Sequence, residues 1–238
     1  MLWEMAGKFG TPYFTNFINS ELDIADVRSM CCRLKLDLTE LRKRNGGLFG
    51  SGDSTGSIGV VTINLPQLAY RAKGDKEEFF RLLENYLDIA KDSLEIKRRW
   101  LQKNVMDNHL VPAFIEYVGT LNNHFSTIGV VGMNEMCENF LGVNIRDEEA
   151  IKFCLSVGEF IRGKLLKYQN ETGNLYNYEA TPAESTCYRL ALNDKKLYPD
   201  IITRGSGKDC YYTNSCHIPV DLVTSINDTF AHQEKLQA

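Results

Sequence analysis

The chain has 238 residues, of which 43% are hydrophobic and 24% are charged, and its formal net charge is −4. This composition is typical of a folded protein with one large α/β domain or two small ones. The slightly acidic balance argues against a broad nucleic-acid-binding surface, and no apolar run reaches the roughly 20 residues that a membrane-spanning helix needs.

The cysteine pattern bears on the compartment and on metal binding. Seven cysteines at scattered spacing, without a C-x-x-C pair, indicate neither a disulfide framework nor a zinc ribbon. The first residues lack the basic and apolar segments of a signal peptide, so we expect a cytoplasmic protein. His109, His124 and His232 have no cysteine or acidic partner at ligand spacing, so we predict no metal site.

Two adjacent cysteines, Cys31 and Cys32, precede a glycine-rich connector at residues 45–56. One interpretation is a reactive thiol on a loop beside a buried strand. The other is a pair of inert core thiols, because unpaired cysteine is among the most buried residue types. The residue types alone favour the second interpretation.

Strands and helices alternate after the connector. The apolar, β-branched run from Ile58 to Leu65 predicts a strand buried on both faces, and Pro66 suits the start of a helix. Apolar residues at helical spacing predict a long helix from Lys76 to about Val105. Later strands are predicted at 126–132, 175–180 and 211–214. Helices are predicted at 134–141, at 147–169 and from Asp221, with Asp147 as the N-cap of the second. A further helix is predicted from Thr181 as N-cap, with Pro182 at its first helical position.

This order of elements predicts an α/β fold with a mostly parallel sheet and crossover helices. We expect four or five strands from the repeat length of such units. In such folds ligands bind at the carboxyl ends of the strands.

Four segments, in this order along the chain, resemble a known family. They are Met30–Arg33 with Gly56–Pro66, Ser126–Glu135, Glu179–Thr186, and Tyr211–Val220. Each is weakly specific alone, but together they cover nearly the whole chain. They resemble the anaerobic (class III) ribonucleoside-triphosphate reductases, and each segment is expected at the carboxyl end of a strand.

The resemblance implies a ten-stranded α/β barrel of the glycyl-radical and ribonucleotide-reductase type, with the reactive cysteine on a loop through its centre. We expect residues 1–238 to form a single partial catalytic barrel domain, about the second half of that barrel. The family's N-terminal regulatory region, C-terminal glycyl-radical motif and zinc-binding cysteine pairs are not found in the sequence. We therefore expect an internal piece of a longer enzyme.

The resemblance places a transient thiyl radical on Cys32, with Cys31 as a packing residue or an auxiliary thiol. Removal of a ribose 2′-hydroxyl first requires a radical at the neighbouring 3′ carbon, and a sheltered sulfur radical can abstract that hydrogen atom. The resemblance also implies that Glu184 is a proton-transfer group or a hydrogen-bond partner of the ribose. By local pattern alone, Glu184 is an ordinary first-turn acid of a helix.

The other residues implied at the site carry hydroxyl, amide or thiol groups. Hydroxyls and free N–H groups at a helix start can hold a phosphate. The substrate-binding residues that we expect are Ser57, Thr181, Ser185, Thr186, Asn214 and Ser215. Cys216 is either a second redox-active thiol or merely buried. Ser57 stands where formate-using members carry asparagine, which argues against formate and leaves a thiol-based reductant as the alternative.

The resemblance also implies partners. The substrate is a ribonucleoside triphosphate, and nucleotides act as effectors. The family uses a glycyl radical generated by a radical-SAM activating enzyme and a structural zinc, both outside this segment. The complete enzyme is expected to be a homodimer, without membrane or direct nucleic-acid contacts.

Two alternatives belong to other classes. The chain can be a non-catalytic nucleotide-binding or subunit-interaction fragment. It can also be part of another glycyl-radical enzyme of the formate-lyase type, because a radical-transfer loop there can also carry adjacent cysteines.

Overall fold

The computed structural model describes residues 2–9, 55–223 and 225–237. The chain divides into two compact units, residues 1–53 and 54–238. In the first unit, helix α1 (Leu2–Phe9) has Glu4 in its first turn and Lys8 in its last turn. This charge order complements the helix dipole.

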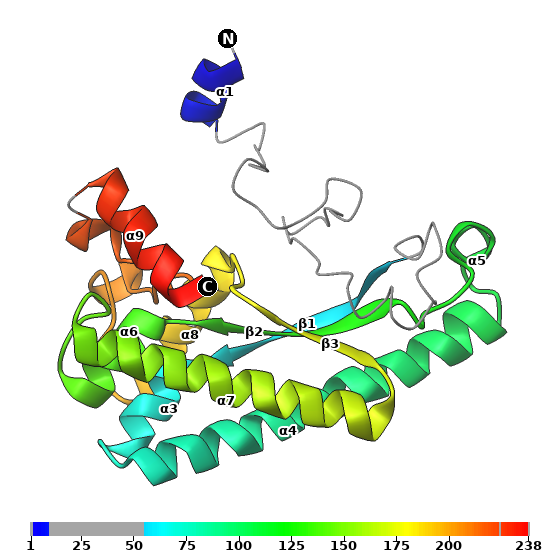
Figure 1. The fold of residues 1–238 in the computed structure, drawn as a ribbon, viewed down its shortest axis with the longest axis horizontal. Coiled ribbons are helices and arrows are strands. Elements are labelled where there is room, and N and C mark those ends of the chain that lie inside the picture. Colours follow the sequence, from blue (N-terminus) through cyan, green and yellow to red (C-terminus); the bar gives the residue numbers. More distant parts are fainter. Residues whose placement is uncertain (1, 10–54, 224, 238) are drawn as a thin grey trace. The chain divides into compact units, whose positions relative to one another are not determined.

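Three parallel strands form the sheet of the second unit (Figure 1). Their order is β1 (Gly56–Asn64), β2 (His124–Val131) and β3 (Leu175–Glu179). Asn64 pairs with Val131, and Gly129 pairs with Glu179. The central strand β2 is buried along its whole length. Because the strands are parallel, their carboxyl ends lie at one edge of the sheet.

Helices connect successive strands, as the alternating pattern predicts. Between β1 and β2 lie α3 (Leu65–Ala72), α4 (Lys76–Leu101), a π-helical turn (Gln102–Asp107) and α5 (Pro112–Val118). Between β2 and β3 lie α6 (Met133–Leu141) and α7 (Glu148–Thr172). After β3 come α8 (Glu184–Leu197), two 3-10 turns (Gly207–Asp209 and Val220–Leu222) and α9 (Ile226–Gln237).

Local signals account for several helix starts. Asp75 caps α4 by accepting a hydrogen bond from the N–H of Glu77 at 2.9 Å. Asp147 caps α7 in the same way through the N–H of Glu149 at 2.9 Å, which confirms the predicted cap. Pro66 lies in the first turn of α3, as predicted, where its missing N–H leaves no helical hydrogen bond unmade.

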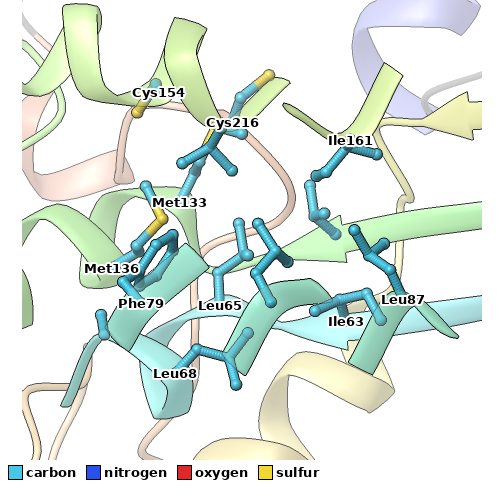
Figure 2. Packing of buried hydrophobic residues seen from close by; sticks show 14 of the residues in the cluster. Ile63, Leu65, Leu68, Phe79, Leu87, Met133, Met136, Cys154, Ile161 and Cys216 are labelled. Atoms are coloured by element: carbon cyan, nitrogen blue, oxygen red, sulfur yellow. The ribbon is translucent and has the colours of Figure 1, made fainter. Parts of the chain in front are cut away.

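The main hydrophobic core lies between the sheet and the helices α4 and α7, which run side by side along one face (Figure 1). Ile63 of β1 and Ile128 of β2 point into this core, where they pack with Leu87 of α4 and Ile161 of α7. Figure 2 shows part of this packing, including the thiols of Cys154 and Cys216. Burial of these side chains is the main source of stability for the second unit.

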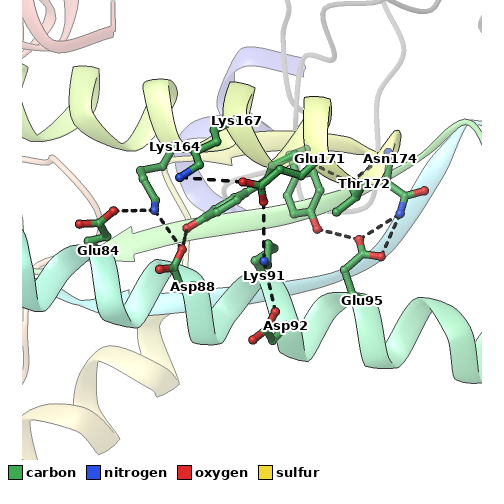
Figure 3. Close-up of polar contacts among 12 residues, drawn as sticks. Glu84, Asp88, Lys91, Asp92, Glu95, Lys164, Lys167, Glu171, Thr172 and Asn174 are labelled. Atoms are coloured by element: carbon green, nitrogen blue, oxygen red, sulfur yellow. Dashed lines mark hydrogen bonds and ion pairs between the residues drawn. The ribbon is translucent and has the colours of Figure 1, made fainter.

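Polar side chains along the contact between α4 and α7 are closely paired (Figure 3). Lys164 of α7 lies 2.9 Å from a carboxylate oxygen of Glu84 and 3.0 Å from one of Asp88. The hydroxyl of Tyr168 donates to Asp88 at 2.5 Å. Burial and this contact raise the pKa of Tyr168, so its hydroxyl remains a donor. The two long helices are therefore held in register by specific contacts as well as by apolar packing.

A smaller cluster covers the opposite face at the carboxyl end of β2. Val131 packs there against Cys187 and Ala191 of α8 and against Cys210 and Tyr212. The side chain of Val131 points away from α4 and α7, because successive residues of a strand face opposite sides. Helix α8 and the chain around Tyr212 therefore lie on the other side of the sheet.

The expectation that the 58–65 strand is buried on both faces is wrong. Val60 of β1 is 40% exposed, and among the described residues β1 pairs with a strand on one side only. The strand with full two-sided burial is β2. A β-branched apolar run indicates strand propensity, but the position in the sheet decides burial.

The strand predicted at residues 211–214 is also not present. Tyr211 forms a single antiparallel bridge with Arg204. The carbonyls of Thr213 and Ser215 instead accept hydrogen bonds from the first residues around α6, and Ser215 has a φ of 38°. The backbone groups of this segment thus bond to the start of α6, to Cys187, to the side chain of Glu135 and to a single bridge, and not to a continuous ladder.

Two helix starts differ from the prediction. Helix α8 begins at Glu184 with Ala183 at the N-cap position, and not after Thr181. The last helix begins at Ile226, whereas Asp221 lies in a 3-10 turn. A cap-like dipeptide does not by itself start a helix. Here the side chain of Thr181 lies over Gly129 of β2, and the N-cap position is taken by Ala183.

The described residues contain three strands, so the predicted four or five are not reached there. The α/β class and the parallel sheet are confirmed. Closure into a ten-stranded barrel stays a prediction. Among the described helices, none is both long and apolar enough to cross a bilayer.

Candidate active site

The carboxyl ends of the strands meet a polar segment at residues 211–217. The N–H of Gly132, just after β2, donates to the carbonyl of Thr213 at 2.8 Å. The N–H of Met133, the first residue of α6, donates to the carbonyl of Ser215 at 3.0 Å. The segment therefore runs across the end of β2, close to where helices α6 and α8 begin.

Asp194 of α8 links the end of β1 to the 211–217 segment by hydrogen bonds. Its carboxylate accepts hydrogen bonds from the amides of Asn64 at 2.7 Å and Gln67 at 2.6 Å, and from the hydroxyl of Tyr212 at 2.8 Å. Asp194 is buried, and three donors offset the cost of burying its charge. Burial and the adjacent Asp194 raise the pKa of Tyr212, which keeps its proton for this bond.

Glu135 of α6 holds the polar segment in place. Its carboxylate is fully buried and accepts from the N–H and the hydroxyl of Thr213, at 2.8 and 2.7 Å. Arg204 lies 3.4 Å from Glu135 and also pairs with Glu138. Burial raises the pKa of Glu138, although the positive charge of Arg204 opposes this shift.

Asn214, an expected substrate ligand, has an internal role in this structure. Its side-chain oxygen accepts from the N–H of Ala183 at 3.1 Å and from the thiol of Cys187 at 3.1 Å. Asn214 thus fixes the start of α8 against the polar segment. Burial raises the pKa of Cys187 to about 12, so this thiol is a donor and not a thiolate.

The expected phosphate-binding residues gather at the start of α8. Glu184 and Ser185 are exposed, and Thr186 and Thr181 are partly buried. The hydroxyl of Thr181 lies directly over Gly129, where an added Cβ would collide with it. The structure therefore brings Thr181, Glu184, Ser185 and Thr186 together beside the end of β2.

Ser57 is not brought to this place. It is exposed and pairs with Phe125 at the amino ends of β1 and β2. Seven residues separate it from Asn64, a span of about 23 Å at the rise of a strand. The structure therefore does not bring Ser57 to the edge where the other expected ligands lie, and its substrate-binding role stays a prediction.

The thiols have different positions. Cys31 and Cys32 lie outside the described residues, so their roles stay predictions. Cys216 is buried in the main core, with its sulfur 3.6 Å from the amide oxygen of Gln233 (Figure 2). Ser215 is also buried, and its hydroxyl lies 3.9 Å from the Cys216 sulfur.

Glu179 was not among the site residues expected from the sequence. It is the last residue of β3, is 2% exposed, and has no hydrogen-bond partner for either carboxylate oxygen among the described residues. Burial raises its pKa. The sequence did offer a signal for Glu179. Successive residues of a strand face opposite sides, so Asn177 and Glu179 lie on one face of β3 and the two tyrosines on the other, which puts polar side chains on a buried face.

Asp194, Glu135 and Arg204 were also missed. Glu135 ends one of the family-like segments without having been assigned a role, and Asp194 and Arg204 lie outside those segments. Glu135 and Asp194 sit in helices, where charged residues usually face solvent. Their partners are 60 or more residues away along the chain for most of these contacts. A single sequence carries no signal for such pairs.

Comparison with known proteins identifies the family to which the chain is similar. The family described as "Anaerobic ribonucleoside-triphosphate reductase" matches residues 1–238. Relatives of that name from Salmonella typhimurium and Escherichia coli are each 27% identical over 210 residues, which cover 81% of this chain and 28% of the relative. The relative from phage T4 is 25% identical over 191 residues, 71% of this chain and 29% of its own length. The chain thus spans less than a third of these relatives.

Solved structures agree with the sequence matches. The anaerobic ribonucleotide reductase from Thermotoga maritima with glycerol in the active site is 26% identical, with a TM-score of 0.64 over 77% of this chain and 30% of that chain. The structure of the same protein in complex with dATP and CTP also has a TM-score of 0.64 and 26% identity, and covers 77% of this chain and 31% of that chain.

Proposed function

Because this chain belongs to the anaerobic ribonucleoside-triphosphate reductase family, we propose that it supplies part of the catalytic barrel of such a reductase. The reaction converts ribonucleoside triphosphates to deoxyribonucleoside triphosphates for DNA synthesis, in the cytoplasm. The observation that carries the proposal is the convergence of β2, β3 and the 211–217 segment on the start of α8. Ligands of open parallel sheets bind at such edges.

Cys32 is the proposed site of the thiyl radical. A sulfur radical there removes the hydrogen atom from the 3′ carbon of the ribose, which leaves a thiol on Cys32 and a radical on the substrate. The neighbouring 2′-hydroxyl can then leave as water once it is protonated. Cys31 and Cys216 are proposed only as auxiliary thiols, and the burial of Cys216 in the apolar core argues against a redox role for it.

The start of α8 is proposed to bind phosphate and ribose. Thr181, Ser185 and Thr186 supply hydroxyls around a helix end that carries partial positive charge. Exposed Glu184 is proposed to accept a hydrogen bond from the substrate or to transfer a proton. Asn214 and Ser215 contribute by shaping this edge, because their described contacts are internal.

Partners follow from the same proposal. The Thermotoga maritima protein has been solved with dATP in its specificity site and in complex with dATP and CTP. We infer that this chain likewise acts on nucleotides and responds to nucleotide effectors. We also propose that it works as a homodimer with a glycyl-radical segment, a zinc-binding region and a radical-SAM activating enzyme. Ser57 replaces asparagine in the formate-linked position, so the proposal does not include formate as the reductant and leaves a thiol as the alternative.

A substitution at Cys32 tests the proposal. In a complete reductase that contains this segment, Cys32→Ser should abolish formation of deoxynucleotide while the glycyl radical still appears in the electron paramagnetic resonance spectrum. Cys210→Ala, in the small cluster beside α8, is the matched control and should retain turnover. Turnover in the Cys32→Ser enzyme would remove Cys32 from the radical role.

A second candidate function rests on the hydroxyl groups and the helix end at the start of α8, which can bind phosphate without any chemistry. The 238-residue chain by itself can act as a nucleotide-binding module without chemistry. CTP titration of this chain, and anaerobic turnover assays with and without an added glycyl-radical segment and activating enzyme, separate the two. Binding without product in both assays supports the module, and product formation in the supplemented assay contradicts it.

A further inference from the structure

One face of the sheet carries polar side chains that no described helix pairs. Thr127 of β2 donates to the side chain of Asn177 of β3 at 2.7 Å, so these two residues face the same side. Gly129 and Glu179 are the next in-register pair on that side. Ser126 and Tyr176 face the other side, where they bond to Arg98 and Glu95 of α4. Glu179 therefore points away from α4 and α7.

Glu179 differs from the other buried carboxylates at this edge. Asp194 has three donors and Glu135 has the N–H and hydroxyl of Thr213. Glu179 is equally buried, but within the described parts of the chain neither of its oxygens has a partner. The hydroxyl oxygen of Thr181, which lies over Gly129, is likewise buried and unpartnered among the described residues.

A buried polar group without a partner destabilises a protein, and more strongly if the group is charged. Here two such groups occur two residues apart, on the sheet face that adjoins the start of α8. Gly129 makes room for this arrangement, because its missing side chain lets the Thr181 hydroxyl approach the strand. Unsatisfied polar groups that converge on one place are typical of sites whose partner is a ligand.

We propose that the carboxyl group of Glu179 and the hydroxyl of Thr181 together bind a ribose hydroxyl of the substrate. This inference rests on the proposed function, which supplies a ribose at this edge. A phosphate does not fit, because ionised phosphate oxygens only accept hydrogen bonds and would leave the acceptor oxygen of Glu179 without a donor. A cation does not fit either, because among the described residues no three acidic, cysteine or histidine side chains converge. A ribose hydroxyl both donates and accepts, and so satisfies both groups.

The protonation state of Glu179 predicts which substitutions preserve binding of the ribose hydroxyl. Burial raises its pKa, which favours the neutral acid. A neutral carboxyl group offers an O–H donor and a carbonyl acceptor, and a glutamine amide likewise combines an N–H donor group with a carbonyl acceptor. Glutamine is therefore expected to replace Glu179 in binding, whereas a leucine of similar size is not.

Binding of two nucleotides to the 238-residue chain tests the inference. CTP and 2′,3′-dideoxy-CTP differ only in the ribose hydroxyls. Calorimetric titration should show that Glu179→Leu weakens CTP binding roughly 10-fold or more, while Glu179→Gln stays within roughly 3-fold, as expected for loss or retention of one buried hydrogen bond. Binding of dideoxy-CTP should be the same in all three proteins. Glu148→Gln, an exposed glutamate at the start of α7, is the matched control and should bind CTP like the wild type.

Carbon-13 spectra of glutamate-labelled chain give an independent readout. The Glu179 carboxyl signal, assigned by its loss in Glu179→Gln, should shift with CTP and not with dideoxy-CTP. An equal shift with both nucleotides, or CTP shifts elsewhere that leave Glu179 unchanged, would overturn this inference alone. If CTP shifts no signal and shows no heat of binding, nucleotide binding by this chain is contradicted as well, and the proposed function fails with it.

Discussion

The two faces of the sheet differ in how their polar groups are satisfied. On the face covered by α4 and α7, apolar side chains fill the core between the helices and the sheet. Charged side chains along the contact between the two helices, such as Lys164 and Asp88, are paired (Figure 3). On the opposite face, Gly129, Glu179 and Thr181 leave two buried polar groups without partners in the described structure. The first face stabilises the fold, and the second is arranged for a ligand at some cost in stability.

The largest effect is expected on the helix-covered face. Leu87 of α4 is fully buried in the main core, so Leu87→Ala should lower the free energy of unfolding by about 2–5 kcal/mol. Ile89, on the same helix, is 65% exposed, and Ile89→Ala should change stability by less than about 0.5 kcal/mol. Urea denaturation of both variants measures the difference. A similar loss in the two would mean that α4 does not bury Leu87 against the sheet.

A smaller effect on stability, with a loss of binding, is expected on the opposite face. In Gly129→Ala the new methyl group would collide with the Thr181 hydroxyl and push it away, at a cost of about 1–3 kcal/mol. Gly163 lies in the interior of α7 with open space around it, so Gly163→Ala should stabilise the protein by about 0.5–1 kcal/mol. Thermal unfolding and CTP titration of both variants provide the comparison. Unchanged CTP affinity in Gly129→Ala would argue against a role for Thr181.

The smallest effect is a difference in pH dependence between the faces. Burial raises the pKa of Glu179, so the folded chain holds this proton more tightly than the unfolded chain does. Its contribution to stability is full below the unfolded pKa and is lost as the pH rises through the folded pKa. Burial also acts to raise the pKa of Asp88, but the hydrogen bonds from Tyr168 and Lys164 lower it overall. The contribution of Asp88 is therefore present above its unfolded pKa and lost as the pH falls through its folded pKa.

Urea denaturation between pH 3 and 8 checks these signs. Relative to the wild type, Glu179→Gln should gain stability as the pH rises, because an unpaired buried carboxylate is removed. Asp88→Asn should lose stability over the same rise, because a paired carboxylate is removed. A common sign for the two variants would contradict the distinction between the faces.

The sequence motifs identified the family, and the comparisons confirm it. The strands around residues 58–65, 126–132 and 175–180 and the cap at Asp147 were also predicted correctly, since periodicity and capping are local properties. The 211–214 strand and the α8 start at Thr181 failed because distant groups, at the end of β2 and over Gly129, decide their hydrogen bonds.

The site residues also divide into those that the sequence predicted and those that only the structure revealed. Residues 181–186 were placed at one edge from their motif, and the structure puts them together at the start of α8. Ser57 was expected at the site from the family resemblance, but it lies at the amino end of β1. Glu179 was missed because its burial and lack of a partner are visible only once β2, β3 and α8 are assembled.

The sequence by itself determined the family, the alternation of strands and helices and the residue types available for chemistry, because each of these depends on near neighbours along the chain. Only the tertiary structure decided which polar groups are paired. Asp194, Glu135 and Asn214 find donors from remote elements, whereas Glu179 and Thr181 are buried without one in the described chain. Burial and hydrogen bonding are properties of the assembled fold, since they depend on what lies on every side of a group and not on its position in the chain.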